Sequence, residues 1–209
     1  MFGIILGNIE VVEFEKKDFS QSCNVLGRAF LDQPNVLAML DGDVIKAEKL
    51  LGTGIFELIK LNRRYNKVWT AYSNGIMVGV VNVAKWPHCQ MSAFEKLRTA
   101  PRMMRMLGSS ATKALKMMSA WEKQDPKKPH LHIGPIGVIP EIQGKGVGTK
   151  LMEACLVEAD SENLPAYLET DRERNVPFYE KLGFNVIGEE AILGVQNRYM
   201  WRESKDLLK

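Results

Sequence analysis

The sequence predicts a single α+β domain spanning residues 1–209, and three observations support this fold class. A chain of 209 residues is long enough for one well-packed core and short for two. The Asn-Gly pair at 74–75 separates two apolar runs rich in β-branched residues, which is the pattern of a β-hairpin. Segments with apolar residues at helical spacing alternate with the predicted strands.

The first third of the chain shows both periodicities. Strands are predicted where β-branched residues gather, and helices where apolar residues recur every three or four positions behind a capping side chain. The predicted elements are a strand at Ile9–Phe14, a helix from Asp18 or Ser20 to Phe30, a helix at Val44–Leu61, and hairpin strands at Val68–Tyr72 and Ile76–Val83.

Residues 88–129 are predicted to form a helical insertion. From Met91 to Trp121 the apolar side chains form one stripe at helical spacing, and Pro101 is expected to start a new helix. A methionine-rich stripe is typical of a core, and an adaptable pocket lining is the alternative. The segment from Glu95 to Lys128 holds nine basic and three acidic residues, which indicates either a solvated face or attraction for an anion.

The last third alternates strands and helices. Pro177 suits a first helical turn and Gly183 a helix end, so a short helix is predicted between them. The predicted elements are a strand at Leu131–Val138, a helix within 144–162, a strand at Ala166–Glu169, a helix at Pro177–Leu182, and strands at Phe184–Ile187 and Arg198–Arg202.

Composition excludes several classes of protein. No apolar run approaches the roughly 18 residues of a membrane span, and the apolar start lacks the basic segment and cleavage site of a signal peptide. The net charge of +3 is too small to indicate a nucleic-acid partner. Cys23, Cys89 and Cys155 are odd in number and widely spaced, which favours reduced thiols in the cytoplasm and argues against a zinc site. We therefore expect no bound metal.

A glycine turn precedes the helix predicted within 144–162. It reads Gln-Gly-Lys-Gly-Val-Gly over residues 143–148. A helix N-terminus presents free N–H groups and a positive dipole, and glycines let a phosphate approach the backbone closely. The spacing fits neither a P-loop nor the G-x-G-x-x-G dinucleotide fingerprint.

The turn matches Q/R-x-x-G-x-G/A, and on this motif the chain resembles the GNAT acetyltransferase superfamily. Leu168-Glu-Thr170 and Arg174-Asn-Val-Pro-Phe-Tyr-Glu-Lys-Leu-Gly-Phe184 resemble the second half of that family, so the match runs over residues 130–187. The sequences of these two segments are especially similar to those of the puromycin N-acetyltransferase branch. The resemblance implies a mixed, mostly antiparallel sheet that splays between its fourth and fifth strands, with helices on both faces and the insertion before the fourth strand.

The resemblance also implies that the chain binds acetyl-CoA. Pro135 cannot donate to a ladder, so it marks an edge or bulge. In the resembled fold this strand splays from its neighbour, which leaves the main chain of the next three residues free to pair with the pantetheine arm. Lys145 or Lys150 would assist the pyrophosphate. The implied binding residues are Ile136, Gly137, Val138, Gln143, Gly144, Lys145, Gly146, Val147, Gly148, Thr149, Asn175 and Tyr179.

Catalytic roles follow from the same resemblance. Tyr179 lies four residues after Asn175, the family's spacing for the tyrosine that protonates the leaving thiolate, and the N–H of Val138 is the expected oxyanion donor. The base is left open between His132, Glu169 and a water chain. His132 lies eleven residues before Gln143, where the histone-acetyltransferase branch has a glutamate. If side chains alternate, it shares a face with Val138.

The expected function is transfer of acetyl to the primary amine of a small molecule in a ternary complex. The alternatives are a protein or peptide acetyltransferase and a non-catalytic CoA-binding regulator. Acids and apolar groups near the expected acceptor side favour an amine with an apolar or aromatic body, and a homodimer is left open. The side chains meant are Asp32, Asp41, Asp43, Phe30 and Trp86.

Overall fold

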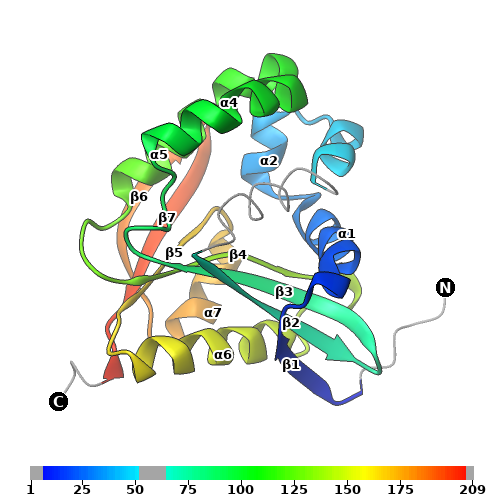
Figure 1. The fold of residues 1–209 in the computed structure, drawn as a ribbon, viewed down its shortest axis with the longest axis vertical. Helices are drawn as coiled ribbons and strands as arrows, with labels where there is room; N and C mark the ends of the chain where they lie inside the picture. Colours follow the sequence, from blue (N-terminus) through cyan, green and yellow to red (C-terminus); the bar gives the residue numbers. More distant parts are fainter. Residues whose placement is uncertain (1–6, 52–64, 206–209) are drawn as a thin grey trace.

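A computed structural model describes residues 7–51 and 65–205, and it contains a seven-stranded mixed sheet with helices on both faces (Figure 1). The strand order is β1-β2-β3-β4-β5-β7-β6. The strands are β1 Ile9–Glu13, β2 Asn66–Ser73, β3 Ile76–Lys85, β4 Leu131–Val138, β5 Ala166–Thr170, β6 Asn185–Ile192 and β7 Val195–Arg202. The helices are α1 Phe19–Phe30, α2 Pro34–Met39, α4 Ala93–Leu107, α5 Ala111–Gln124, α6 Val147–Ser161 and α7 Val176–Glu180.

The helices form two layers. Figure 1 shows α6 and α7 below the sheet and α1, α2, α4 and α5 above it. The main core lies where strands β2 to β4 contact α1 on one face and α6 on the other, and Leu26 and Leu151 are fully buried there. No helix in the described ranges is long and apolar enough to span a membrane.

The Asn-Gly hairpin is confirmed. Asn74 and Gly75 have φ values of 51° and 75°, and two positive φ values in succession are the mark of a type I′ turn. This turn joins β2 to β3 in antiparallel register. The hairpin lies next to the central strand of the sheet, because β3 also pairs with β4.

The splay between the fourth and fifth strands is also confirmed. Strands β4 and β5 run parallel and pair only at Leu131 with Ala166 and at His132 with Tyr167. Strand β4 continues to Val138 against β3. Beyond His132 one edge of β4 therefore has no neighbouring strand among the described residues.

The insertion differs from its prediction. Pro101 lies inside α4 and starts no helix, and the break comes at Gly108, where φ is 53°. The predicted apolar stripe is wrong for α4, because Phe94, Leu97 and Met104 are 73%, 75% and 61% exposed. The proline is tolerated because the carbonyl that loses its partner belongs to Leu97, on the solvent side.

The remaining predicted elements fit with shifted ends. The helix predicted at Val44–Leu61 is present over residues 44–51, and its continuation lies outside the described residues. Strand β6 extends to Ile192, five residues beyond its prediction, across a register shift next to Gly188. This part of the strand was not predicted, because Glu189 and Glu190 interrupt the apolar pattern from which strands are predicted.

An ion pair fixes the end of α6 to β7. Both terminal nitrogens of the Arg202 guanidinium donate to Asp160, at 2.8 and 2.9 Å, and this hydrogen bonding lowers the pKa of Asp160. Because the pKa of Asp160 is lower in the folded chain, the pair stabilises the fold fully at a pH above the unfolded-state pKa of about 3.9. This stabilisation is lost as the pH falls through the folded-state pKa.

Replacing Asp160 by Asn tests this pair. We expect Asp160→Asn to lower the free energy of unfolding at pH 7 by about 1.5–3 kcal/mol, the range for hydrogen bonds to charged groups. The difference from wild type should shrink below about pH 4 in denaturant titrations. Glu153→Gln, which changes an exposed acid of the same helix, is the control. An equal loss at pH 7 and pH 3 would rule out the charge as the cause.

Candidate active site

The glycine turn leads into α6 with its backbone exposed. Gly144 and Gly146 have φ values of 76° and 86°, and a Cβ built on either would meet nothing within 4 Å. The first bond of the helix runs from the N–H of Lys150 to the carbonyl of Gly146, at 3.1 Å. The three preceding N–H groups, from Val147 to Thr149, therefore have no partner within the helix. The turn offers amides and open space to an anion.

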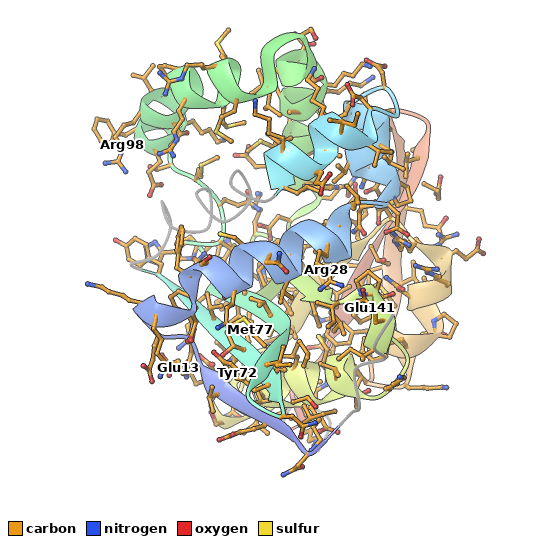
Figure 2. The ribbon with its side chains drawn as sticks, turned by 90° about the vertical axis from the view of Figure 1, so that its right-hand side faces the viewer. Glu13, Arg28, Tyr72, Met77, Arg98 and Glu141 are labelled. Atoms are coloured by element: carbon orange, nitrogen blue, oxygen red, sulfur yellow. The ribbon has the colours of Figure 1, made fainter. Side chains whose placement is uncertain are left out.

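Side chains fix the position of this turn. The amide of Gln143 donates to the carbonyl of Val138 at 2.9 Å, which ties the turn to the end of β4. Arg28 of α1 pairs with Glu141 just ahead of the turn, and Figure 2 shows the two side chains together. Lys150 donates to the carbonyl of Ile9 at 3.3 Å. Lys145, which is exposed, is the lysine that the turn itself presents to solvent.

The unpaired edge of β4 points its peptide groups into the splay. The N–H of Ile139 donates to Val78 of β3 at 3.0 Å, and peptide groups alternate in direction along a strand. The N–H and carbonyl of Val138, and those of Ile136, therefore face the gap. Gly137 pairs with Val80 of β3, so its own peptide groups face the other way. A Cβ on Gly137 would meet Leu26 and Ala29 at 3.0 Å, so glycine lets α1 lie close to the sheet here.

Helix α7 lies against the same turn. The ring of Phe178 is 3.6 Å from the Cβ position of Gly148, and the next residue is Tyr179. Tyr179 is buried, and burial together with the Asp171 carboxylate raises its pKa, so the hydroxyl stays protonated at neutral pH. Asn175 ends the short 3₁₀ turn that precedes α7.

The structure brings His132 and Glu169 together. Nε2 of His132 lies 3.0 Å from Oε2 of Glu169, in hydrogen-bond contact across the start of the splay. His132 does not share a face with Val138, which corrects the alternation argument. Ile133 and Ile136 are three residues apart on β4, but their partners Val83 and Val81 are only two apart on β3. This β-bulge moves the side chains that follow it to the opposite face of the sheet.

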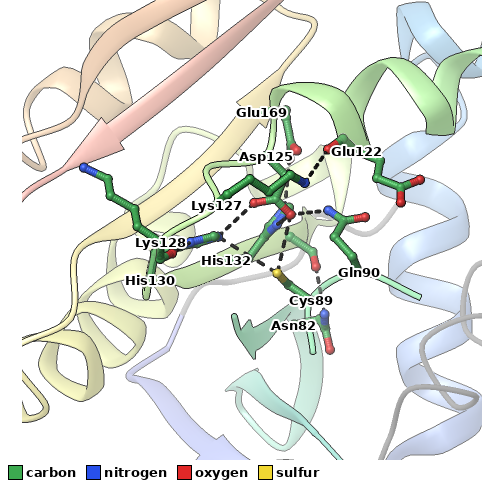
Figure 3. Close-up of polar contacts among 11 residues, drawn as sticks. Asn82, Cys89, Gln90, Glu122, Asp125, Lys127, Lys128, His130, His132 and Glu169 are labelled. Atoms are coloured by element: carbon green, nitrogen blue, oxygen red, sulfur yellow. Dashed lines mark hydrogen bonds and ion pairs between the residues drawn. The ribbon is translucent and has the colours of Figure 1, made fainter. Parts of the chain in front are cut away.

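A four-donor cluster adjoins this pair on the side of α5 (Figure 3). It consists of Cys89, Asp125, His130 and His132. Sequence reasoning missed Cys89 and Asp125, which lie in loops far from the glycine turn. The available signal was the His-x-His at 130–132 following an aspartate at a helix end. Burial opposes the charge on His130, but the contacts with Asp125, Cys89 and the Lys128 carbonyl together outweigh it and raise the pKa of His130 to about 9.

The acids expected on the acceptor side are already engaged. Asp32 pairs with Arg172 and Asp41 with Lys113, while Asp43 accepts from the N–H of Lys46. The splay contributes a different acid. Asp171, directly after β5, is buried, and one of its carboxylate oxygens accepts from the N–H of Asn35 at 2.8 Å.

The second oxygen of Asp171 is buried without a hydrogen-bond partner. Burial raises the pKa of this carboxyl. Asp171 also contributes to the pKa shift of Tyr179, so the two side chains act on one another electrostatically. An unsatisfied carboxylate oxygen of this kind is suited to an incoming cationic or hydrogen-bonding group.

Known proteins resemble this chain in sequence. A model of the acetyltransferase (GNAT) family matches residues 47–184, which is more than half of the chain. Mycothiol acetyltransferases are similar in sequence: that of Propionibacterium freudenreichii subsp. shermanii is 34% identical over 67 residues, or 31% of this chain and 22% of the relative. That of Paenarthrobacter aurescens is 39% identical over 71 residues, with the same two shares. The chain spans about a fifth of the length of these curated relatives.

Solved structures share the fold over nearly the whole chain. A Corynebacterium glutamicum protein described as histone acetyltransferase HPA2 and related acetyltransferase is 22% identical, with a TM-score of 0.70 over 94% of this chain and 96% of that one. The Drosophila melanogaster polyamine N-acetyltransferase, which forms N-acetylagmatine, is 15% identical, with a TM-score of 0.63 over 93% and 98%. A Thermoplasma acidophilum N-acetyltransferase in complex with coenzyme A is 13% identical, with a TM-score of 0.56 over 94% and 99%.

Proposed function

This chain belongs to the acetyltransferase (GNAT) family, and from that premise we propose that it transfers acetyl from acetyl-CoA to the primary amine of a small molecule. One observation carries the proposal. The free edge of β4 lies directly beside the open glycine turn, so an extended arm and its terminal phosphates can be held by one continuous run of backbone.

The residues present fit the acyl donor. The amides of residues 144–149 would hold the pyrophosphate, with Lys145 adding charge, and Ile136 and Val138 would pair with the pantetheine arm as a short added strand. Bound there, acetyl-CoA supplies an activated acyl group. Gln143 serves by fixing the turn against Val138, because its side chain bonds that carbonyl. Asn175 lies beside α7 and would complete the site near the arm.

Three protein groups divide the chemistry. The N–H of Val138 points into the splay and stabilises the charge that develops on the thioester oxygen. The hydroxyl of Tyr179 donates to the leaving thiolate. Glu169 accepts the proton of the attacking amine, directly or through a water, and His132 positions Glu169 through the 3.0 Å contact. This division of roles supports direct attack in a ternary complex, because it needs no nucleophilic side chain.

For the acceptor we propose a primary amine with an apolar or aromatic body, as in the puromycin N-acetyltransferase branch that the sequence resembles. Phe30 packs on β4 near Gly137 and Trp86 follows β3, so aromatic groups flank the expected acceptor side. Asp171 supplies an unsatisfied carboxylate oxygen for the ammonium. The Drosophila enzyme's product, N-acetylagmatine, supports the small-amine class.

A panel of amines tests this function. Thiol release from acetyl-CoA should be fastest with primary amines that carry an aromatic body, with kcat/KM about tenfold or more above that for spermidine, an aminoglycoside or a histone peptide. The N,N-dimethyl analogue of the best amine is the control, because it cannot be acetylated stably. A faster reaction with spermidine or the peptide would refute the acceptor class. No release with any amine, despite acetyl-CoA binding, would indicate a non-catalytic CoA-binding protein.

A further inference from the structure

The four-donor cluster is built from three separate parts of the chain. Cys89 lies in the loop after β3, Asp125 at the end of α5, and the two histidines at the start of β4. Figure 3 shows the four side chains pointing toward a common centre. Their thiol, carboxylate and imidazole atoms all lie within 4.8 Å of one another. We propose that the four-donor cluster binds one divalent transition-metal ion of the zinc class.

The separations are close to those of a tetrahedral site. Zinc bonds of about 2.0–2.1 Å to nitrogen or oxygen and about 2.3 Å to sulfur give tetrahedral edges of about 3.3–3.8 Å. Oδ2 of Asp125 lies 3.4 Å from Sγ of Cys89, and Oδ1 of the same carboxylate lies 3.1 Å from Nε2 of His130. Oδ2 of Asp125 lies 3.7 Å from Nδ1 of His132, and Sγ of Cys89 lies 4.0 Å from Nε2 of His130.

Both imidazoles are oriented as metal ligands usually are. Nδ1 of His130 lies 2.8 Å from the carbonyl of Lys128, and Nε2 of His132 lies 3.0 Å from Glu169. A carbonyl or carboxylate on the outer nitrogen fixes the tautomer and leaves the inner nitrogen with a lone pair for the ion. The outer partners therefore direct Nε2 of His130 and Nδ1 of His132 into the centre.

Two buried inward atoms have no hydrogen-bond partner. They are Oδ1 of Asp125 and Nδ1 of His132. Asp125 is only 2% exposed, and its Oδ1 lies close to His130 without forming a hydrogen bond of acceptable geometry. A cation shared by the cluster would satisfy both of these atoms. Gln90 donates to the other oxygen of Asp125 and holds the carboxylate in place.

The donor set selects the class of ion. Thiolate and imidazole suit zinc and its neighbours, and they disfavour magnesium and calcium, which prefer oxygen. Four protein ligands fill a tetrahedral shell, so the ion would stabilise the junction between α5 and β4 and not act as a Lewis acid. The widely spaced cysteines argued against zinc in the sequence, but one cysteine is enough when two histidines and an aspartate complete the shell.

Zinc and cobalt titrations of the full chain test the site, with a readout independent of acetyl transfer. Protein stripped with a chelator should bind one Zn²⁺ per chain and show a rise in melting temperature. Co²⁺ should give the visible bands of a tetrahedral site and a thiolate charge-transfer band. Cys89→Ser should abolish that band and weaken Zn²⁺ binding about 100-fold or more, since loss of an outer-shell partner alone costs 10–100-fold.

Two controls make the test specific. His88→Gln changes the exposed histidine next to Cys89, and Cys23→Ser changes a buried cysteine far from the cluster; both should bind zinc like wild type. His130→Gln should lose binding, and Cys89→Ser covers the case in which that buried substitution does not fold. Substoichiometric Zn²⁺ binding by wild type, or equal affinity in Cys89→Ser and His88→Gln, would overturn the proposal. Activity in metal-free protein would leave the acetyltransferase function standing by itself.

Discussion

Tyr179→Phe is expected to lower kcat by about 10²–10⁴-fold, the usual contribution of a positioned acid or base. The variant removes one oxygen and keeps the ring that packs against Phe178 and Phe184. Burial and Asp171 keep the hydroxyl protonated, so wild type always has a donor for the departing sulfur. Binding of acetyl-CoA should change little, because the thiolate charge exists only as the bond breaks.

The measurement is single-turnover acetyl transfer with the best amine of the panel, alongside calorimetric binding of CoA. Tyr72→Phe is the matched control. Its hydroxyl donates to Asp18 at 2.6 Å, on the outer part of the sheet, so its loss should affect stability and not turnover. An unchanged single-turnover rate in Tyr179→Phe would remove this hydroxyl from the mechanism.

Gly146→Leu is expected to weaken CoA binding by about 100-fold or more. A side chain at this position projects into space that the protein leaves open, where the pyrophosphate would lie. Charge-assisted hydrogen bonds contribute about 1.5–3 kcal/mol each, so displacing the phosphates from two amides costs a factor of this size. The loss should appear as a higher Kd in calorimetry, with the fold intact by circular dichroism.

Strain must be separated from steric exclusion at this glycine. The φ of 86° strains any side chain, so part of the effect on stability has nothing to do with the ligand. Gly194→Leu reproduces the strain, because Gly194 has a φ of 82°, faces open space and lies in the turn between β6 and β7. Equal CoA affinity in Gly146→Leu and wild type would exclude the turn as the phosphate site.

The sequence was most informative where local chemistry decides the structure. The Asn-Gly turn, the strand at Leu131–Val138 and the helix after the glycine turn were predicted with ends within a few residues, because turn residues and periodicity act locally. Pro101 and the stripe through Phe94 were misjudged, because helical spacing does not say whether a neighbour will cover that face. Tertiary packing makes that choice.

The candidate site shows the same division. The glycine turn and Tyr179 each lie in a short continuous sequence motif, so their residues could be named in advance. The contact of His132 with Glu169 depends on β4 and β5 staying together for only two pairs. The bulge opposite Val81 and Val83 decides which face His132 occupies, and no local pattern gives its position. Asp125 reaches the cluster because α5 ends beside the start of β4, and this packing is not visible in the local sequence.

The short contact between β4 and β5 also has a consequence for what can enter the sheet. A free strand edge at the rim of a protein recruits strands from other molecules, which is a hazard for aggregation. Here the free edge lies inside a wedge whose sides start at pairing distance, about 4.8 Å, and diverge. A thin, unbranched chain fits such a wedge, whereas a strand already paired in another protein is too wide. The narrow gap therefore admits a thin, unbranched ligand and excludes a strand of another protein, which could otherwise pair with this edge and cause aggregation.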